Sequence, residues 1–227
     1  MSDRRDVQSS SDFIIRDNLG RATIHPRTDS FRRSRAIQLI PRKDLLTKIL
    51  ALDAEFQFIY DESTAIHTPV IGRIIVNDSG RTIWDVFVHF TLLTGQKIKL
   101  PPAEKSFGVY SNDIKTENGA VPIEEVGETL REIIEGRTIV GHSILSDIAA
   151  IQGSGLGDVL EYALSYRDTQ KHAHCQHVLD IRQPSLRKLY EQVAGQGIQG
   201  NGHSSVEDAQ ATMHLYRLRE PQIEVEQ

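Results

Sequence analysis

The sequence has a single cysteine, Cys175, among 227 residues, so no internal disulfide framework holds the chain together. One cysteine also fits a reducing, intracellular compartment. No run of about 18 apolar residues is present, and the N-terminus is polar where a signal peptide would be apolar. We therefore expect a soluble, intracellular protein with no membrane partner.

Positive charge is also in short supply. The formal net charge is -5, which by itself argues mildly against a nucleic-acid partner. The distribution matters more than the total, because 10 of the 26 basic and 6 of the 31 acidic residues lie within residues 1–45. That segment is therefore net +4 and the remainder net -9, and part of this acidity is expected to bind metal ions.

Residues 1–45 are rich in Ser, Asp and Arg with little apolar periodicity, so we expect a disordered polar and basic N-terminal tail. Arg32-Arg33-Ser34-Arg35 and Arg42-Lys43 are short basic motifs that suit phosphate contact or a nuclear address. The alternative is a solvated charged linker. Residues 221–227 are expected to form a C-terminal tail.

The chain between these tails, residues 46–220, suits one α/β domain, because 39% hydrophobic composition supplies one sizeable core. Its first half predicts an antiparallel meander of three strands, with Asn77-Asp78-Ser79-Gly80 as a turn. Residues 91–118 are poorly periodic and are expected to be loop, with one short helix at most. The three strands are predicted over Ile49–Tyr60, Val70–Val76 and Arg81–Phe90.

From Pro122 onward the apolar spacing becomes helical, and short strands alternate with helices. A meander followed by this alternation predicts an α/β fold with a mixed five-stranded sheet flanked by helices. The two further strands are predicted over Thr138–Val140 and Leu160–Arg167, and the helices over Pro122–Gly136, Ile144–Ile151, Pro184–Ala194 and Ser204–Leu218.

Two acidic residues lie within the first predicted strand. Side chains of a strand alternate between its faces, so Asp53 and Glu55 share one face while Leu52, Ala54 and Phe56 share the other. Like charges this close repel unless a cation lies between them, and hard divalent cations such as Mg²⁺ or Mn²⁺ prefer oxygen ligands. The alternative is an exposed polar face of an edge strand.

Two further acids stand on helices predicted far downstream. Asp147 lies on the mid-chain helix and Asp208 on the last helix, with His203 just before that helix begins. Four carboxylates from three elements suit a site for two divalent ions about 3.5–4 Å apart, which acts on phosphodiesters. A histidine at a loop-helix junction suits acceptance of the water proton, since its unperturbed pKa is about 6.5.

At these residues the chain resembles the DEDDh family of 3′→5′ exonucleases, which have the ribonuclease H-like fold. Asp53-Ala54-Glu55 matches the first motif, Gly141 to Asp147 matches Gly-His-x-x-x-x-Asp, and His203 to Asp208 matches His-x-x-x-x-Asp. The stretch from Gly202 to Met213 is most similar to the REX-type and interferon-stimulated RNA exonuclease branch. Ile71-Gly72-Arg73, Asp78-Ser79-Gly80 and Ile198-Gln199 also resemble that branch, over residues 49–218 in all.

The resemblance implies a catalytic set of five residues: Asp53, Glu55, Asp147 and Asp208 as ligands of two Mg²⁺ or Mn²⁺ ions, and His203 as general base. It further implies a nucleoside 5′-monophosphate product, released from the 3′ end of single-stranded RNA, with DNA as the second candidate. A nuclear or nucleolar location is the family precedent.

Three residues beside the motif positions are candidate substrate contacts: Ala54, Phe56 and His142. The resemblance places Phe56 against the terminal nucleotide. Base-aromatic stacking of this kind is worth about 1–3 kcal/mol. For His142 the alternative is a hydrogen-bonded packing residue after a buried strand.

The chain also departs from the branch. The first motif usually continues Cys-Glu-Met-Val, whereas Ala54-Glu55-Phe56-Gln57 stands here. The branch carries a Tyr-Arg-Thr-Arg-x-Ser-Gly stretch, and the nearest equivalent, Phe107 to Asp113, has neither arginine. Arginines of this kind contact phosphate and sugar. The rival interpretation is therefore a catalytically silent module that binds nucleic acid or protein.

Three other features are assigned no role in catalysis. The segment from Lys171 to His177 contains four candidate zinc ligands: His172, His174, Cys175 and His177. They are too close together in the sequence to surround one tetrahedral ion, so we expect a surface loop. Asp168 is interpreted as structural. Glu207 points about 100° away from Asp208 on the predicted helix and is left out of the site.

Overall fold

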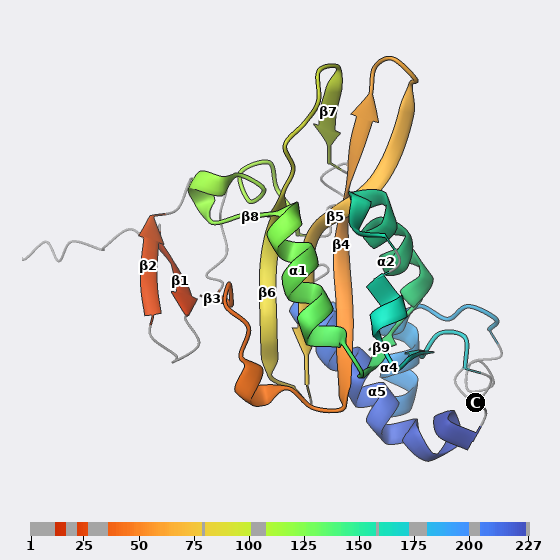
Figure 1. Cartoon of the computed structure of the whole chain (residues 1–227). Coiled ribbons are helices and arrows are strands. Elements are labelled where there is room, and N and C mark those ends of the chain that lie inside the picture. The colour runs from red at the N-terminus through yellow and green to blue at the C-terminus, as the bar shows by residue number, and fades with distance from the viewer. Residues whose placement is uncertain are drawn as a thin grey trace, which may run out of the picture.

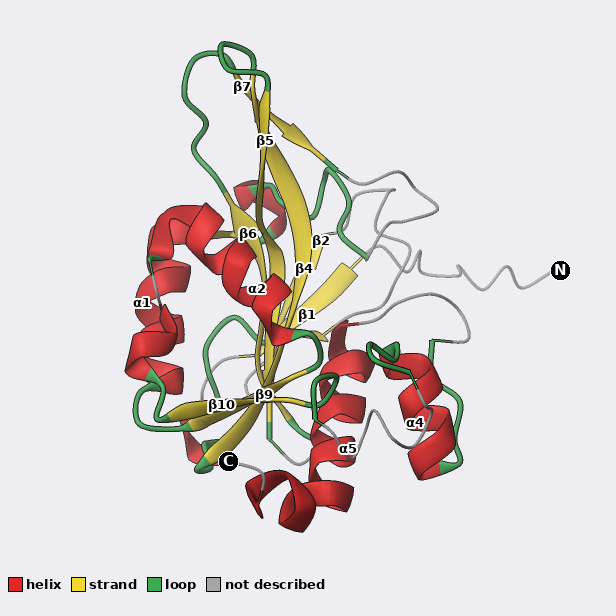
Figure 2. Cartoon of the chain, turned by 90° about the vertical axis from the view of Figure 1, so that its right-hand side faces the viewer, coloured by secondary structure: helices red, strands yellow, loops and turns green. Residues whose placement is uncertain are grey.

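The computed structural model describes residues 12–16, 22–26, 36–78, 80–100, 108–157, 159–172, 181–199 and 205–225. A mixed sheet of seven strands forms its centre, in the order β10-β9-β4-β5-β6-β8, with β7 paired to β4 off this path. Helices cover both faces of the sheet, as the two perpendicular views show (Figure 1, Figure 2). The α/β class predicted from the sequence is confirmed.

The predicted meander forms the middle of the sheet. β4 (Ile49–Asp61), β5 (Ile66–Asn77) and β6 (Thr82–His89) pair in antiparallel order, and Glu55 lies opposite Arg73. β9 (Thr138–Gly141) and β10 (Ser165–Asp168) extend the sheet beyond β4 in parallel order.

The prediction of five strands is wrong, because two short strands arise outside the predicted ones. β7 (Gln96–Lys99) pairs with β4, and β8 (Val121–Pro122) pairs with β6. Strands of two to four residues are too short to show alternation, and pairing with a longer neighbour decides their conformation. The strand predicted from Leu160 begins at Ser165, after a 3-10 turn over Val159–Tyr162.

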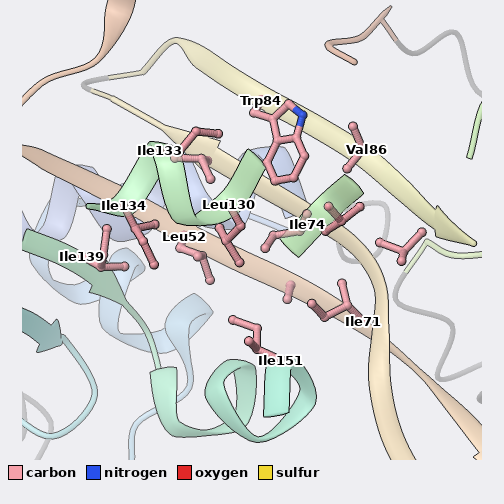
Figure 3. Packing of buried hydrophobic residues seen from close by; sticks show 14 of the residues in the cluster. Leu52, Ile71, Ile74, Trp84, Val86, Leu130, Ile133, Ile134, Ile139 and Ile151 are labelled. Carbon is pink, nitrogen blue, oxygen red and sulfur yellow. The ribbon is translucent and has the colours of Figure 1, made fainter. Parts of the chain in front are cut away.

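Two helices cover one face of the sheet. α1 (Ile123–Ile134) and α2 (Ile144–Ile151) lie over it, where Leu130, Ile133 and Ile134 pack against strand residues (Figure 3). Their spacing of three and four residues forms the apolar stripe that such a helix buries. The strand residues in this core include Leu52, Ile71, Ile74, Trp84, Val86 and Ile139.

The other face is covered by α5 (Ser205–Val225), against which α4 (Leu186–Ala194) packs. α5 continues past its predicted end at Leu218 and through Pro221, into the expected C-terminal tail. Its last turn is held by Glu224, whose carboxylate accepts hydrogen bonds from Arg167 at 2.8 and 2.7 Å and from the Tyr216 hydroxyl at 2.9 Å. These tertiary contacts offset the hydrogen bond that proline cannot donate.

Parts of the predicted N-terminal tail are strands. β1 (Asp12–Arg16), β2 (Ala22–Pro26) and β3 (Ala36–Ile37) form a small separate sheet. A 3-10 turn over Lys43–Leu45 follows. The basic pair beside it meets acids, since Arg42 binds Asp44 and Lys43 binds Glu132 at 2.7 Å.

The motif Arg32 to Arg35 lies outside the described residues. The boundaries 1–45, 46–220 and 221–227 stay predictions. Within the described ranges, no helix combines the length and the apolar character needed to span a bilayer.

Candidate metal centre

The site forms where the central strand has an open edge. On the side of β4 away from β5, β9 pairs only with Ile49–Ala51 and β7 only with Phe58–Asp61. Between these two partners, residues 52–57 have no described strand beside them. Asp147 of α2 covers part of this edge, because its Oδ1 accepts a hydrogen bond from the backbone N–H of Ala54 at 2.9 Å.

Three carboxylates meet beside this edge. Asp53, Glu55 and Asp208 each place an oxygen within 4.8 Å of the others. Alternation along β4 directs the first two to one face, and Asp208 reaches them from the first turn of α5. Glu55 and Asp208 are buried, while Asp53 is partly exposed. The structure thus brings three of the four predicted acids within reach of one another.

Asp147 stands slightly apart from this group. It is buried, and it lines the same cavity of about 330 Å³ as the three other acids. Its Oδ1 is engaged by Ala54, so it meets the cluster from the α2 side of the strand. All four predicted carboxylates therefore border one cavity, and three of them form the tight group.

The electrostatics of the cavity favour a cation. Burial raises the pKa of Asp53 well above its usual range, and the charges of Glu55, Asp147 and Asp208 raise it further. Burial likewise raises the pKa of Asp147 to about 8, against the lowering effect of its hydrogen bond from Ala54. Several carboxylates that repel one another in a buried space are stabilised by a positive ion. The donor set consists of carboxylate oxygens and fits a hard divalent metal ion.

Side chains that the sequence did not single out hold the carboxylates in place. The Ser205 hydroxyl donates to Glu55 Oε1 at 2.8 Å, and Gln199 Nε2 donates to Asp208 Oδ1 at 2.8 Å. Glu207 Oε2 in turn accepts the backbone N–H of Gln199 at 2.9 Å. Gln199 has a φ of 61°, a left-handed conformation that is uncommon outside glycine. The Gln199–Glu207 pair thus positions one oxygen of Asp208.

Glu207, which the sequence pattern excludes from the site, therefore acts on it indirectly. Its carboxylate binds the backbone of Gln199, and the Gln199 side chain binds Asp208. The dipeptide Ile198-Gln199 carried the only signal in the sequence, through its likeness to the exonuclease branch. Nothing in the pattern specified that its amide would reach Asp208.

The other predicted site residues are His203 and the candidate substrate contacts Phe56, Ala54 and His142. His203 lies outside the described residues, although Gln199 and Ser205, which bracket segment 200–204, both bind site carboxylates. Phe56, Ala54 and His142 line the cavity with the four acids. Substrate contact by these three stays a prediction.

His142 has partners for both ring nitrogens. Nδ1 lies 2.9 Å from Thr169 Oγ1, and Nε2 lies 3.0 Å from the Pro184 carbonyl. Burial lowers the pKa of its imidazole. These contacts agree with the packing alternative. Asp168, interpreted as structural, accepts hydrogen bonds from the backbone N–H groups of Ser143 at 2.9 Å and Gln170 at 3.0 Å.

A buried ion pair lies behind the cluster on the same face. Arg73, opposite Glu55 in the sheet, binds both carboxylate oxygens of Asp85 at 2.8 and 2.7 Å, and each side chain is 1% exposed. The guanidinium also lies 5.0 Å from the Phe87 ring centre. It supplies a fixed positive charge next to the acidic group.

The proposed surface loop falls largely outside the described residues. Of its zinc-ligand candidates only His172 is described, and its Nε2 lies 3.3 Å from the Ile223 carbonyl.

No protein-family model matches the chain. Curated relatives do match. RNA exonuclease 4 of Debaryomyces hansenii is 33% identical over 195 residues, covering 83% of this chain and 65% of the relative. RNA exonuclease 4 of Saccharomyces cerevisiae is 32% identical over 183 residues, covering 78% and 56%. The chain thus spans less than two thirds of the length of either relative.

Solved structures share the fold. The Neurospora crassa Pan2 catalytic unit (protease and nuclease domain) aligns with a TM-score of 0.58 at 19% identity, over 88% of this chain and 32% of that one. The Saccharomyces cerevisiae Pan2 pseudoubiquitin hydrolase-RNA exonuclease module in complex with AAGGA RNA aligns with a TM-score of 0.59 at 21% identity, over 88% and 33%. This likeness confirms the predicted ribonuclease H-like fold.

Proposed function

We propose that this chain, which belongs to the DEDDh exonuclease family, is a metal-dependent 3′→5′ exonuclease that hydrolyses single-stranded RNA to nucleoside 5′-monophosphates. The observation that carries the proposal is the group of three carboxylates within 4.8 Å, with Asp147 on the same cavity. The names of the curated relatives and the titles of the structural neighbours support RNA as the substrate class.

Four residues are assigned to metal binding. Asp53, Glu55, Asp147 and Asp208 would hold two divalent ions, Mg²⁺ or Mn²⁺, because hard cations bind carboxylate oxygens and all four acids line one cavity. When bound, such a pair of ions stabilises both the attacking and the leaving oxygen of a phosphodiester.

The chain's own groups supply positioning and proton transfer. His203 is assigned as the general base, which takes the proton of the attacking water at a ring nitrogen. Phe56 and Ala54, on the cavity wall, are assigned to the 3′-terminal nucleotide. Gln199 and Ser205 keep the carboxylates of Asp208 and Glu55 from rotating away.

The test is a time course with a 5′-labelled single-stranded RNA and its DNA twin, each with Mg²⁺, Mn²⁺ or EDTA. We expect a ladder that shortens from the 3′ end only with metal, faster for RNA than for DNA. The Asp147→Asn variant is the matched inactive control. Internal cuts, or cleavage in EDTA, would contradict the assignment.

The second candidate function is a silent module that binds nucleic acid without cleaving it. The absence of both branch arginines between Phe107 and Asp113 favours it. Binding of either oligonucleotide without any shortening would support this candidate over the exonuclease.

We also propose a nuclear or nucleolar location, supported by the basic motif Arg32 to Arg35. A fluorescently tagged full chain should concentrate in the nucleus, and replacement of Arg32, Arg33 and Arg35 by Ser should disperse it. An unchanged distribution of the variant would contradict an address in this motif.

A further inference from the structure

A second cavity lies farther along β4, toward the end that pairs with β7. It also has a volume of about 330 Å³. Its lining combines apolar and aromatic side chains with a few polar groups, the composition typical of small-ligand sites. The residues that matter here are Gln57, His89, Phe90, Ile98, Ser111 and Lys115.

Gln57 gives this cavity an unusual polar group. The residue is 0% exposed, and its Nε2 donates to the Ile71 carbonyl at 3.0 Å. Only the amino end of an amide donates to a carbonyl, so this contact fixes the orientation of the side chain. The other end, Oε1, is buried with no hydrogen-bond partner. A buried acceptor without a partner is destabilising, and it is satisfied when a ligand brings an N–H or O–H group.

The position of Gln57 links the cavity to the metal centre. Asp53, Glu55 and Gln57 alternate along β4, so all three point to the same face of the sheet. With a rise of about 3.3 Å per residue, Gln57 lies roughly 7 Å beyond Glu55 and roughly 13 Å beyond Asp53 along the strand. An extended single strand whose 3′ end occupies the first cavity can therefore reach the second one.

Position 57 is one at which this chain departs from the branch that it resembles. Where the exonuclease branch usually has Val two residues after the motif glutamate, this chain has an amide. A valine would fill the space without leaving an acceptor. The polar group therefore belongs to the departures from the branch, and Gln57 is not among the carboxylates assigned to metal binding.

We propose that the second cavity is a subsite for one nucleobase of the substrate strand, located upstream of the terminal nucleotide and recognised through an N–H donor that binds Gln57 Oε1. The proposal rests on the exonuclease function proposed above. Base edges and aromatic faces are how proteins usually recognise single-stranded RNA, and Phe90 and His89 supply the aromatic side chains. Lys115 is exposed at the rim, where its ammonium lies 3.8 Å from the Glu117 carboxylate; a phosphate would compete with that exposed, weak ion pair.

The experiment is an abasic scan. Short RNAs carry one abasic nucleotide at successive positions upstream of the 3′ end, and both kcat/KM for shortening and affinity by fluorescence anisotropy are measured. For the wild type, one position should lose about 5- to 100-fold, the loss expected for one base contact. In Gln57→Val, which installs the branch residue, the penalty at that position should shrink to less than about 3-fold, while other positions keep theirs.

Controls separate the subsite from folding. Gln57→Met keeps the length of the side chain and should behave as Gln57→Val does in the scan. Both variants lose the unpartnered acceptor and also the hydrogen bond to the Ile71 carbonyl, so thermal melting of each confirms that it is folded at the assay temperature. Gln222→Val, at an exposed position of α5, should leave the scan unchanged.

Identical scans for the wild type and Gln57→Val would overturn the subsite. If the wild type binds RNA without shortening it, the proposed exonuclease function fails, while the anisotropy scan still decides the subsite.

Discussion

The Oδ1 atom of Asp147 and the backbone N–H of Ala54, 93 positions apart in the chain, form a buried hydrogen bond of 2.9 Å. One carboxylate thereby serves the fold and the candidate metal centre together. The bond fixes α2 against the open edge of β4, and the same side chain faces the cavity with the other acids. Substitutions at this position can separate the two roles.

Asp147→Asn should abolish cleavage and leave the fold intact. The amide carbonyl still accepts from Ala54, but the charge that binds metal is lost. Asp147→Ala removes the acceptor as well, and leaving the Ala54 N–H unpartnered should cost about 1–3 kcal/mol of unfolding free energy. Denaturant unfolding in EDTA and the RNA time course measure the two effects. Full activity of Asp147→Asn would disprove the assignment.

Metal should stabilise the protein more at high pH. Burial raises the pKa of Asp147 in the folded protein to about 8, from the ordinary value of 3.8 expected in the unfolded chain. The pKa of Asp53 is raised as well. The folded state therefore binds more protons than the unfolded state, and the metal-free protein loses stability as pH rises from about 4 to about 8. The gain in melting temperature on adding Mn²⁺ should be larger at about pH 8 than at about pH 6. A gain that does not change with pH would contradict this.

The Gln199–Glu207 pair should affect metal affinity. Gln199→Ala removes the donor to Asp208 Oδ1, and loss of such an orienting contact typically lowers metal affinity about 10–100-fold. Glu207→Gln keeps an acceptor for the Gln199 N–H and should have a much smaller effect. Mn²⁺ titration of both variants, with Glu220→Gln on the same helix as control, checks this. Equal affinities for Gln199→Ala and wild type would show that the contact is only structural.

His203→Ala should slow shortening of RNA by about 10²–10⁴-fold, the usual range for a general base. Metal affinity should be largely kept, because the histidine is not among the assigned ligands. Single-turnover kinetics at saturating metal measure the first effect, and Mn²⁺ titration the second. Loss of metal binding instead would make His203 a structural residue.

The Arg73–Asp85 pair should behave as a unit. Arg73→Met leaves Asp85 buried without its partner, which costs about 3–5 kcal/mol. The double variant Arg73→Met, Asp85→Leu removes both charges and should recover most of that loss. Urea unfolding of the single and double variants tests this coupling, and additive losses would refute it.

The carboxylate site was largely predictable from the sequence. Alternation along one apolar strand places Asp53 and Glu55 together whatever their surroundings, because the period of two is fixed by backbone geometry. Asp147 and Asp208 follow helix-start signals, and their spacing from Gly141 and His203 carries the family resemblance. The helices and long strands were identified for the same reason, since their patterns extend over several turns or alternations.

The supporting contacts could not be predicted. Gln199 is in a loop, and the direction of its amide depends on a left-handed backbone conformation. Glu207, eight residues later in the first turn of α5, binds the backbone N–H of that residue. β7 and β8 depend on strands already in place beside them. The continuation of α5 through Pro221 depends on Arg167, more than 50 residues earlier. Each is a tertiary effect that outweighs the local signal.

The open edge of β4 has a consequence for solubility. Unpaired strand edges recruit strands from other chains, and proteins usually block them with charges or covering segments. Here part of the gap between β9 and β7 is covered by a carboxylate on a helix, so the group assigned to metal binding also blocks one backbone donor of this edge. Asp147→Ala, which removes this acceptor, should therefore aggregate more readily than Asp147→Asn, which keeps one.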